Sequence, residues 1–113
     1  MQIEQILINL IVNAIDQNQE KKDSWVKVFY KKEGDFVNLI VQDSGKGIIQ
    51  DDLTKIFNPF YTTKEIGKGT GLGLSISRGI ARDHGGDLNY KLIEGHTAFI
   101  LSLPLKQTEI KIS

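Results

Sequence analysis

The chain has 113 residues, with 14 basic and 14 acidic side chains, two histidines and no cysteine. This balance excludes an overall basic surface for nucleic acid, and the absence of cysteine excludes disulfide frameworks and cysteine-based zinc sites. The length predicts a single domain over residues 1–113, with residues 105–113 as a polar tail. The longest apolar runs are far too short to cross a bilayer, so the chain as given is expected to be soluble.

The first part of the chain predicts a helix followed by a hairpin. Apolar side chains recur at three- and four-residue spacing from Ile3 to Ile15, as in an amphipathic helix. The polar residues 17–22 predict a loop. Residues 25–30 and 36–42 are β-rich runs on either side of a turn that contains Gly and Asp, so they predict an antiparallel pair of strands.

The middle of the chain changes character after the second predicted strand. Residues 43–47 form a cluster of turn-forming residues, and residues 50–57 predict a short helix. Residues 58–73 are irregular and rich in glycine. A long stretch of this kind inside a compact domain is typical of a binding loop or a lid.

The last third predicts a second helix and a second hairpin. Residues 74–84 have an amphipathic pattern that ends at two glycines, where the left-handed conformation can close a helix. Residues 87–93 and 97–103 are expected to be strands around a turn at residues 94–96. The fold class is therefore α+β, with two helices packed on one face of an antiparallel-rich sheet.

A run of alternating glycines, GKGTGLGLS at residues 67–75, leads into the second predicted helix. Its spacing fits neither the Walker loop nor the dinucleotide fingerprint. Glycine lets backbone N–H groups approach a phosphate closely, and a helix N-terminus favours an anion. The run therefore favours an anion site, with a flexible surface loop as the alternative.

Polar residues on the first helix and after the second strand are further candidates. Gln5, Asn9 and Asn13 lie four apart, on one helix face. An Asn oxygen can ligate Mg²⁺, although these amides could instead cap backbone groups or face solvent. Asp43 is either an Asx-turn residue or a buried acceptor for the amine of a base.

Four motifs follow one another along the chain. NLIVNA at residues 9–14 resembles the N box, DSGKGI at 43–48 the first glycine box, FNPFYTTK at 57–64 the F box, and GKGTGLGLS the second glycine box. In this order the sequence resembles the catalytic ATP-binding domain of sensor histidine kinases, within the wider group of gyrase, Hsp90 and MutL ATPases. The resemblance implies a two-layer α/β sandwich of the Bergerat type, with an antiparallel-rich mixed sheet and an ATP lid over residues 61–72.

The resemblance also implies ATP and Mg²⁺ as cofactors. Asn13 would ligate Mg²⁺, and Asp43 would accept a hydrogen bond from the adenine amine. Phenylalanines of the F box would anchor the flap, and lysines and backbone groups of the following segment would meet the phosphates. The implied nucleotide-binding set is Asn9, Asn13, Asp43, Gly45, Gly47, Ile48, Phe57, Phe60, Thr63, Lys64, Gly67, Lys68, Gly69, Thr70, Gly71, Leu72, Gly73 and Leu74.

One departure from the wider group bears on the reaction. Asn9 stands where the related ATPases carry a glutamate that activates water, and an amide cannot take that proton. This favours transfer of the γ-phosphate to a protein histidine over hydrolysis, with no catalytic nucleophile in this chain. The alternatives are a catalytically inert nucleotide-binding regulatory module and an ATPase of the same superfamily.

The implied partners are a histidine-containing dimerisation domain of the same parent protein and the receiver domain of a response regulator, with no nucleic acid. Family members also carry a strand ahead of the N-box helix, whereas this sequence opens within that helix. We therefore expect an N-terminally truncated domain whose exposed sheet edge can self-associate. His84 is expected at a helix end and His96 in a turn. The implied location is cytoplasmic, in a parent protein that a membrane can anchor.

Overall fold

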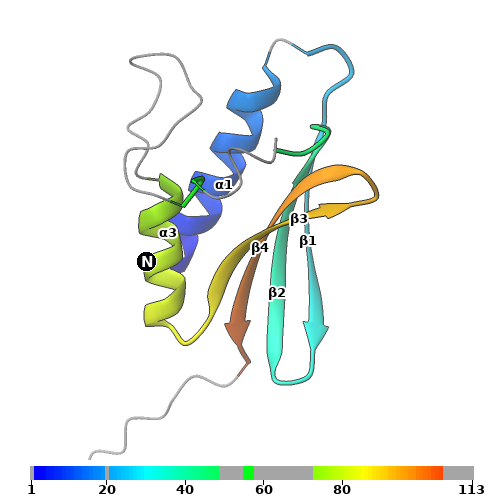
Figure 1. Cartoon of the computed structure of the whole chain (residues 1–113). Helices are drawn as coiled ribbons and strands as arrows, with labels where there is room; N and C mark the ends of the chain where they lie inside the picture. The colour runs from blue at the N-terminus through cyan, green and yellow to red at the C-terminus, as the bar shows by residue number, and fades with distance from the viewer. Residues whose placement is uncertain (1, 20, 49–54, 58–72, 106–113) are drawn as a thin grey trace, which may run out of the picture.

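The computed structural model describes residues 2–19, 21–48, 55–57 and 73–105. The two helices lie together in one layer, and the four strands form a second layer (Figure 1). The predicted two-layer α+β fold is thereby confirmed. In chain order the elements are α1 (Gln2–Asn18), β1 (Val26–Glu33), β2 (Phe36–Asp43), α3 (Gly73–Asp83), β3 (Asp87–Ile93) and β4 (His96–Pro104).

The four described strands form one sheet in the order β1-β2-β4-β3, and all three pairings are antiparallel. Val28 lies opposite Val41, Val41 opposite Phe99, and Phe99 opposite Tyr90. Residues paired in this way point to the same side of the sheet, so this row faces the helices. Strand β1 lies at one edge of the described sheet and β3 at the other.

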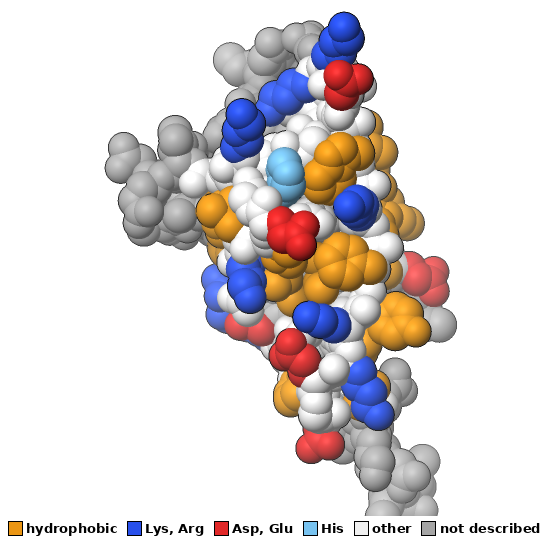
Figure 2. Space-filling model, turned by 90° about the vertical axis from the view of Figure 1, so that its right-hand side faces the viewer, with side chains coloured by type: hydrophobic (Ala, Val, Ile, Leu, Met, Phe, Trp, Pro, Cys, Tyr) orange, Lys and Arg blue, Asp and Glu red, His pale blue; other side chains and the backbone are white. Residues whose placement is uncertain are grey.

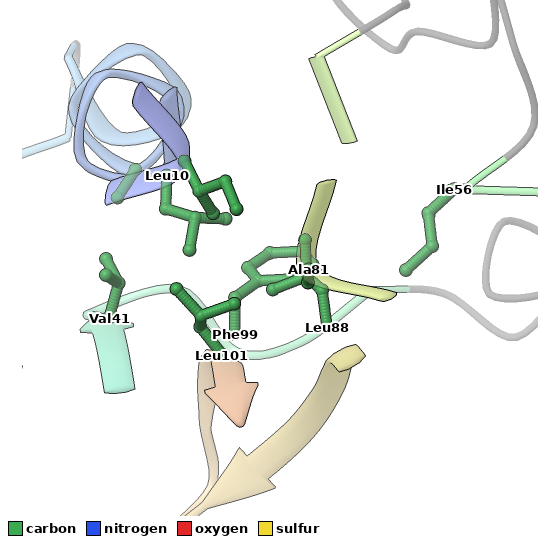
Figure 3. Packing of buried hydrophobic residues seen from close by; sticks show 9 residues of the cluster. Leu10, Val41, Ile56, Ala81, Leu88, Phe99 and Leu101 are labelled. Atoms are coloured by element: carbon green, nitrogen blue, oxygen red, sulfur yellow. The ribbon is translucent and has the colours of Figure 1, made fainter. Parts of the chain in front are cut away.

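The hydrophobic core lies between the helices and three of the strands. Leu10 points from α1 toward Phe99, Leu101 and Leu88, while Ala81 approaches from α3 (Figure 3). Burial of such apolar side chains is the main stabilising contribution to a fold of this size. The buried cluster is Ile6, Leu10, Ala14, Val41, Ile56, Ala81, Leu88, Phe99 and Leu101.

The other face of the sheet carries no described helix. Figure 2 shows this face, on which hydrophobic side chains alternate with lysines and acidic residues. Phe29 and Phe36 are 37% and 41% exposed, and by the strand register both point away from the helices. Among the described elements, both helices therefore cover the same face of the sheet.

The predicted end of the second helix is confirmed in detail. Gly85 has φ +82°, a left-handed conformation that favours glycine. The Gly86 amide donates to the Ala81 carbonyl at 2.9 Å, and the Gly85 amide donates to the Arg82 carbonyl at 3.0 Å. This pair of bonds is the Schellman arrangement, which satisfies carbonyl groups at a helix end.

Some predicted boundaries were wrong. Strand β1 continues to Glu33, because residues 31–33 pair with β2, and only Gly34 and Asp35 remain in the turn. His96 is the first residue of β4 and pairs with Ile93, so it is not a turn residue. Within the predicted short helix, residues 55–57 form a turn. Residues 49–54 and the tail residues 106–113 lie outside the described part of the chain.

Neither of the two described helices is long and apolar enough to span a membrane.

Candidate functional site

The polar face of α1 turns toward α3. Asn9 and Asn13 are both half-buried, whereas Gln5 is exposed. The Asn9 Nδ2 group donates to the hydroxyl of Ser77 at 3.4 Å, and Ser77 is fully buried on α3. This bond joins residues 68 positions apart, and it places Asn9 between the two helices rather than on a solvent-facing surface.

Asp43 is buried at the end of β2, with 6% of its surface exposed. Its Oδ1 atom accepts a hydrogen bond of 2.7 Å from the Gly45 amide, which is the Asx turn considered from the sequence. An ionised carboxylate can only accept hydrogen bonds. The position therefore combines a turn-forming role with a buried acceptor suited to a donor group such as an amine.

The backbone after Asp43 passes close to neighbouring side chains, which favours glycine at two positions. A Cβ at Gly45 would lie 2.7 Å from Asp43 Oδ1 and 3.1 Å from Thr97 Oγ1. Gly47 has φ +103°, and a Cβ there would lie 2.9 Å from both the Tyr90 hydroxyl and a methyl carbon of Leu92. Two of the predicted site glycines thus have a steric reason to be glycine.

The β3–β4 hairpin holds this glycine-containing segment, which we call the glycine loop (residues 44–48). The Gly47 amide donates to Thr97 Oγ1 at 2.9 Å, and the Thr97 amide donates to the Gly45 carbonyl at 3.0 Å. The Ile48 amide donates to the Tyr90 hydroxyl at 3.0 Å. The hairpin residues are therefore part of the site, although the sequence did not predict them.

The start of the glycine loop is also tied to the end of α1 and the start of β1. The Ser44 hydroxyl lies 3.4 Å from Asn18 Oδ1, and Asn18 Nδ2 donates to the Ala14 carbonyl at 2.7 Å. The backbone and hydroxyl of Ser44 pair with Trp25 through two bonds of 3.0 and 3.1 Å. The loop that follows Asp43 is consequently held from three directions.

Phe57, the first residue of the F box, contacts α3. The Arg78 guanidinium lies 4.4 Å from the centre of the Phe57 ring, and Arg78 and Arg82 each contact Asp87 Oδ1 at 3.1 Å. Burial opposes ionisation of Asp87, but hydrogen bonds from the Leu88 amide and the two arginines outweigh it and hold the pKa of Asp87 below its ordinary value. The cluster fixes the F-box turn against α3 and β3.

The remaining predicted site residues divide into two groups. Gly73 and Leu74 begin α3, with Gly73 exposed and Leu74 packed partly against the core. No group of three His, Cys, Asp or Glu side chains that could hold a metal occurs within the described residues. Outside those residues lie Phe60, Thr63, Lys64, Gly67, Lys68, Gly69, Thr70, Gly71 and Leu72, so their contacts with phosphate and the ATP lid stay predictions.

Residues 1–107 match the family of histidine kinase-, DNA gyrase B- and HSP90-like ATPases. Sensor kinase CckA of Brucella abortus is 46% identical over 99 residues, which cover 75% of this chain and 10% of CckA. Sensor histidine kinase ZraS of Salmonella typhimurium is 44% identical over 103 residues, which cover 89% of this chain and 21% of ZraS. The chain thus spans about a tenth and a fifth of the length of these two relatives.

Solved structures agree with the sequence comparison. The catalytic domain of histidine kinase ThkA superposes with a TM-score of 0.78 at 39% identity, covering 91% of this chain and 66% of that chain. Full-length ShkA, in a structure containing AMPPNP, superposes with a TM-score of 0.75 at 27% identity, covering 96% of this chain and 22% of ShkA. The chain therefore belongs to the histidine kinase-, DNA gyrase B- and HSP90-like ATPase family, as a catalytic ATP-binding domain of the sensor histidine kinase type.

Proposed function

We propose that this chain binds Mg²⁺-ATP and donates the γ-phosphate to a histidine on a separate dimerisation domain of its parent protein. The observation that carries the proposal is the buried Asp43, whose glycine loop is held in place from the β3–β4 hairpin, α1 and β1. A buried carboxylate next to a fixed and closely packed backbone suits a flat base that presents an amine.

The base would bind at the end of β2. Oδ1 of Asp43 accepts the Gly45 amide, so the second carboxylate oxygen would accept the hydrogen bond from the exocyclic amine. The glycine loop would border the base and its sugar, because it directly follows Asp43 in the chain. A hydrogen bond to a charged group such as this carboxylate typically contributes about 1.5–3 kcal/mol, whereas one between neutral groups contributes about 1 kcal/mol.

The phosphates would lie between α1 and the start of α3. Asn13 offers a half-buried, neutral amide oxygen one helical turn after Asn9. It lies on the same face of α1 as Asn9, whose side chain bonds to α3. This donor fits Mg²⁺, which uses few protein ligands together with water and phosphate oxygens. When bound, Mg²⁺ would neutralise phosphate charge. The N-terminus of α3 at Gly73 adds a partial positive charge that attracts an anion.

The acceptor would come from outside this chain. Asn9 donates to Ser77 and its amide cannot remove a proton from water, which supports transfer over hydrolysis. ThkA has been crystallised with the response regulator protein TrrA, and we propose a response regulator as the subsequent partner here as well. Since the reaction consumes ATP, we place the domain in the cytoplasm, where a membrane can anchor the parent protein.

A second copy of the chain is a further candidate partner, at the edge of β1. Val28 and Tyr30 are 52% and 73% exposed on that strand, although both point to the helix side. Lys27, Lys31 and Lys32 also lie on β1, and like charges that face each other across a strand pair oppose pairing. We propose that self-association through this edge is weak.

Nucleotide binding by calorimetry tests the base end of the site. We expect the wild-type chain to bind ATP with Mg²⁺, and Asp43→Asn to weaken binding at least tenfold because it removes a charged acceptor. Asp35→Asn is the matched control, since it makes the same chemical change in the exposed β1–β2 turn. A wild-type chain that binds no ATP, or an Asp43→Asn variant with unchanged affinity, would contradict the proposal.

Phosphate transfer tests the reaction. The chain is mixed with the dimerisation domain of its parent protein and radiolabelled ATP, and we expect label on the histidine of that domain. ATP binding without transfer would identify an inert regulatory module instead. Sustained phosphate release by the chain alone, abolished by Asn13→Ala, would identify an ATPase.

A further inference from the structure

We propose that Tyr90 and His96 are positioning residues for the nucleotide: they hold the glycine loop in its binding geometry and so set the affinity for the base. The inference rests on the proposed function, because it concerns the same site. Both residues belong to the β3–β4 hairpin, 42 to 52 positions away in the sequence from the loop that they contact. Neither residue is one of the site residues that the sequence implies.

Tyr90 supports the loop from the helix side of the sheet. Its ring is half-buried and packs edge-on against Phe99, with ring centres 5.8 Å apart. Its hydroxyl accepts the Ile48 amide at 3.0 Å and lies 2.9 Å from where a Cβ of Gly47 would stand. Because Phe99 restrains the ring, the hydroxyl is held directly against the end of the loop.

His96 holds the start of the loop. Its Nδ1 atom lies 3.2 Å from the Ser44 carbonyl oxygen and 3.3 Å from the Gly45 carbonyl oxygen. Carbonyl oxygens only accept hydrogen bonds, so Nδ1 carries the proton and donates it. The imidazole also packs edge-on against Trp25 at 5.0 Å, and Lys27 lies 4.8 Å from the centre of that indole ring. The side chain is therefore fixed by contacts with Trp25, just before β1, and with the loop.

The glycine loop needs such supports because its glycines leave the backbone many conformations. A loop that occupies the binding geometry only part of the time has an apparent affinity reduced by that fraction. The Tyr90 hydroxyl and the His96 Nδ1–H group act at opposite ends of the loop, with Thr97 between them. Removing either bond allows the loop to leave the geometry in which Asp43 and the glycines face the base.

The test compares single hydroxyl removals in the whole chain, with ATP binding measured by calorimetry at a temperature where every variant is folded. Tyr90→Phe is expected to raise the Kd about fivefold, because it removes the hydroxyl and keeps the ring that packs on Phe99. Tyr30→Phe is the matched control, since Tyr30 is 73% exposed on β1, and its Kd should equal that of the wild type.

His96 is tested in the same way. His96→Ala is expected to weaken ATP binding about fivefold, whereas His96→Asn should restore most of the affinity because an amide nitrogen can donate from nearly the position of Nδ1. Equal weakening by both variants would overturn the assignment for His96. A residue that acted only on stability would lower the melting temperature without changing the Kd of the folded chain.

Hydrogen exchange of the Ile48 amide, followed by NMR in the chain without nucleotide, separates this inference from the proposed function. We expect faster exchange of that amide in Tyr90→Phe, with the Leu101 amide in β4 unchanged. Unchanged Ile48 exchange together with an unchanged Kd would overturn the inference and leave the proposed function intact. A wild-type chain that binds no ATP, with Ile48 exchange still dependent on Tyr90, would overturn the proposed nucleotide role and keep only the structural contact.

Discussion

Two neighbouring strands of the sheet, β1 and β2, pair along their whole length and yet lie in different environments. Val28 on β1 and Val41 on β2 lie directly opposite each other and point to the same side, yet they are 52% and 2% exposed. The helices account for the difference, since α1 and α3 lie over the part of the sheet formed by β2, β4 and β3. Strand pairing alone therefore does not bury a side chain.

The candidate site is built on the strands that the helices cover. Asp43 ends β2, and its glycine loop is supported by residues from β3 and β4. On the exposed side, Trp25 contacts the glycine loop through Ser44, and this residue lies just before β1 begins. Within the described residues, the candidate site therefore lies on the strands that the helices cover, and β1 contributes none of its own side chains to it.

The largest expected effect on stability comes from replacing one glycine in each of the two regions. A Cβ at Gly86 would overlap the Ser102 carbonyl oxygen in β4, so Gly86→Ala should cost about 3 kcal/mol of unfolding free energy. Gly34 lies in the β1–β2 turn with φ +56° and open space around it, so Gly34→Ala should cost only about 1 kcal/mol. Urea denaturation of both variants measures the two values. Equal losses would show that the turn of β1 is as constrained as the covered sheet.

The paired valines give the next largest effect. Val41→Ala removes two buried methyl groups and should cost about 2 kcal/mol, including the cavity that it leaves. Val28→Ala makes the same change on the exposed partner and should cost less than about 1 kcal/mol. Chemical denaturation of the two variants side by side tests the comparison directly. A larger loss for Val28→Ala would mean that another segment covers β1 in solution.

A smaller effect is expected at Asp87, where β3 contacts α3. Asp87→Asn should cost about 0.5–1 kcal/mol at pH 7, because the side chain is 35% exposed and solvent screens the arginines. The pKa of Asp87 is lowered by folding, so its stabilising contribution is complete above the ordinary pKa of about 3.9 and is lost as the pH falls through the folded pKa. The difference from the wild type should therefore close below about pH 4 in thermal unfolding.

The smallest effect concerns the edge of β1. Repulsion among its lysines should keep self-association weak, and salt screens such repulsion. Sedimentation velocity should therefore detect more dimer at 0.5 M than at 0.05 M salt, because the Debye length shortens roughly threefold over this range. Dimer that decreases with salt would point instead to an attractive charge contact.

Much of the fold was predictable from local patterns. The amphipathic spacing from Ile3 to Ile15 predicted α1, and the glycines after α3 predicted its end, because both signals act within a few residues. The prediction that His96 lies in a turn was wrong because it also relied on signals from a few neighbouring residues. A residue next to the turn Glu94-Gly95 looks like part of it, and only pairing with Ile93 and contacts with the glycine loop place it in β4.

The residues of the candidate site differ in the same way, since some leave a local signal in the sequence and others do not. Asp43 was predictable as an Asx-turn residue from its local sequence, whereas the roles proposed for Gly45 and Gly47 came from the resemblance to the histidine kinase family. Tyr90 left only a weak signal, a tyrosine in a row of apolar residues on β3, since its partner amide is 42 positions away.

By itself the sequence determined the order of the elements and the family, and it predicted an acceptor at the end of β2, because these depend on spacing and on residue type. Only the tertiary structure decided which side chains support that acceptor. Hydrogen bonds such as Gly47 to Thr97 and Ile48 to Tyr90 join residues 50 and 42 positions apart. They form only when the helix layer packs on the sheet and brings the hairpin under the glycine loop, and no local pattern encodes that arrangement.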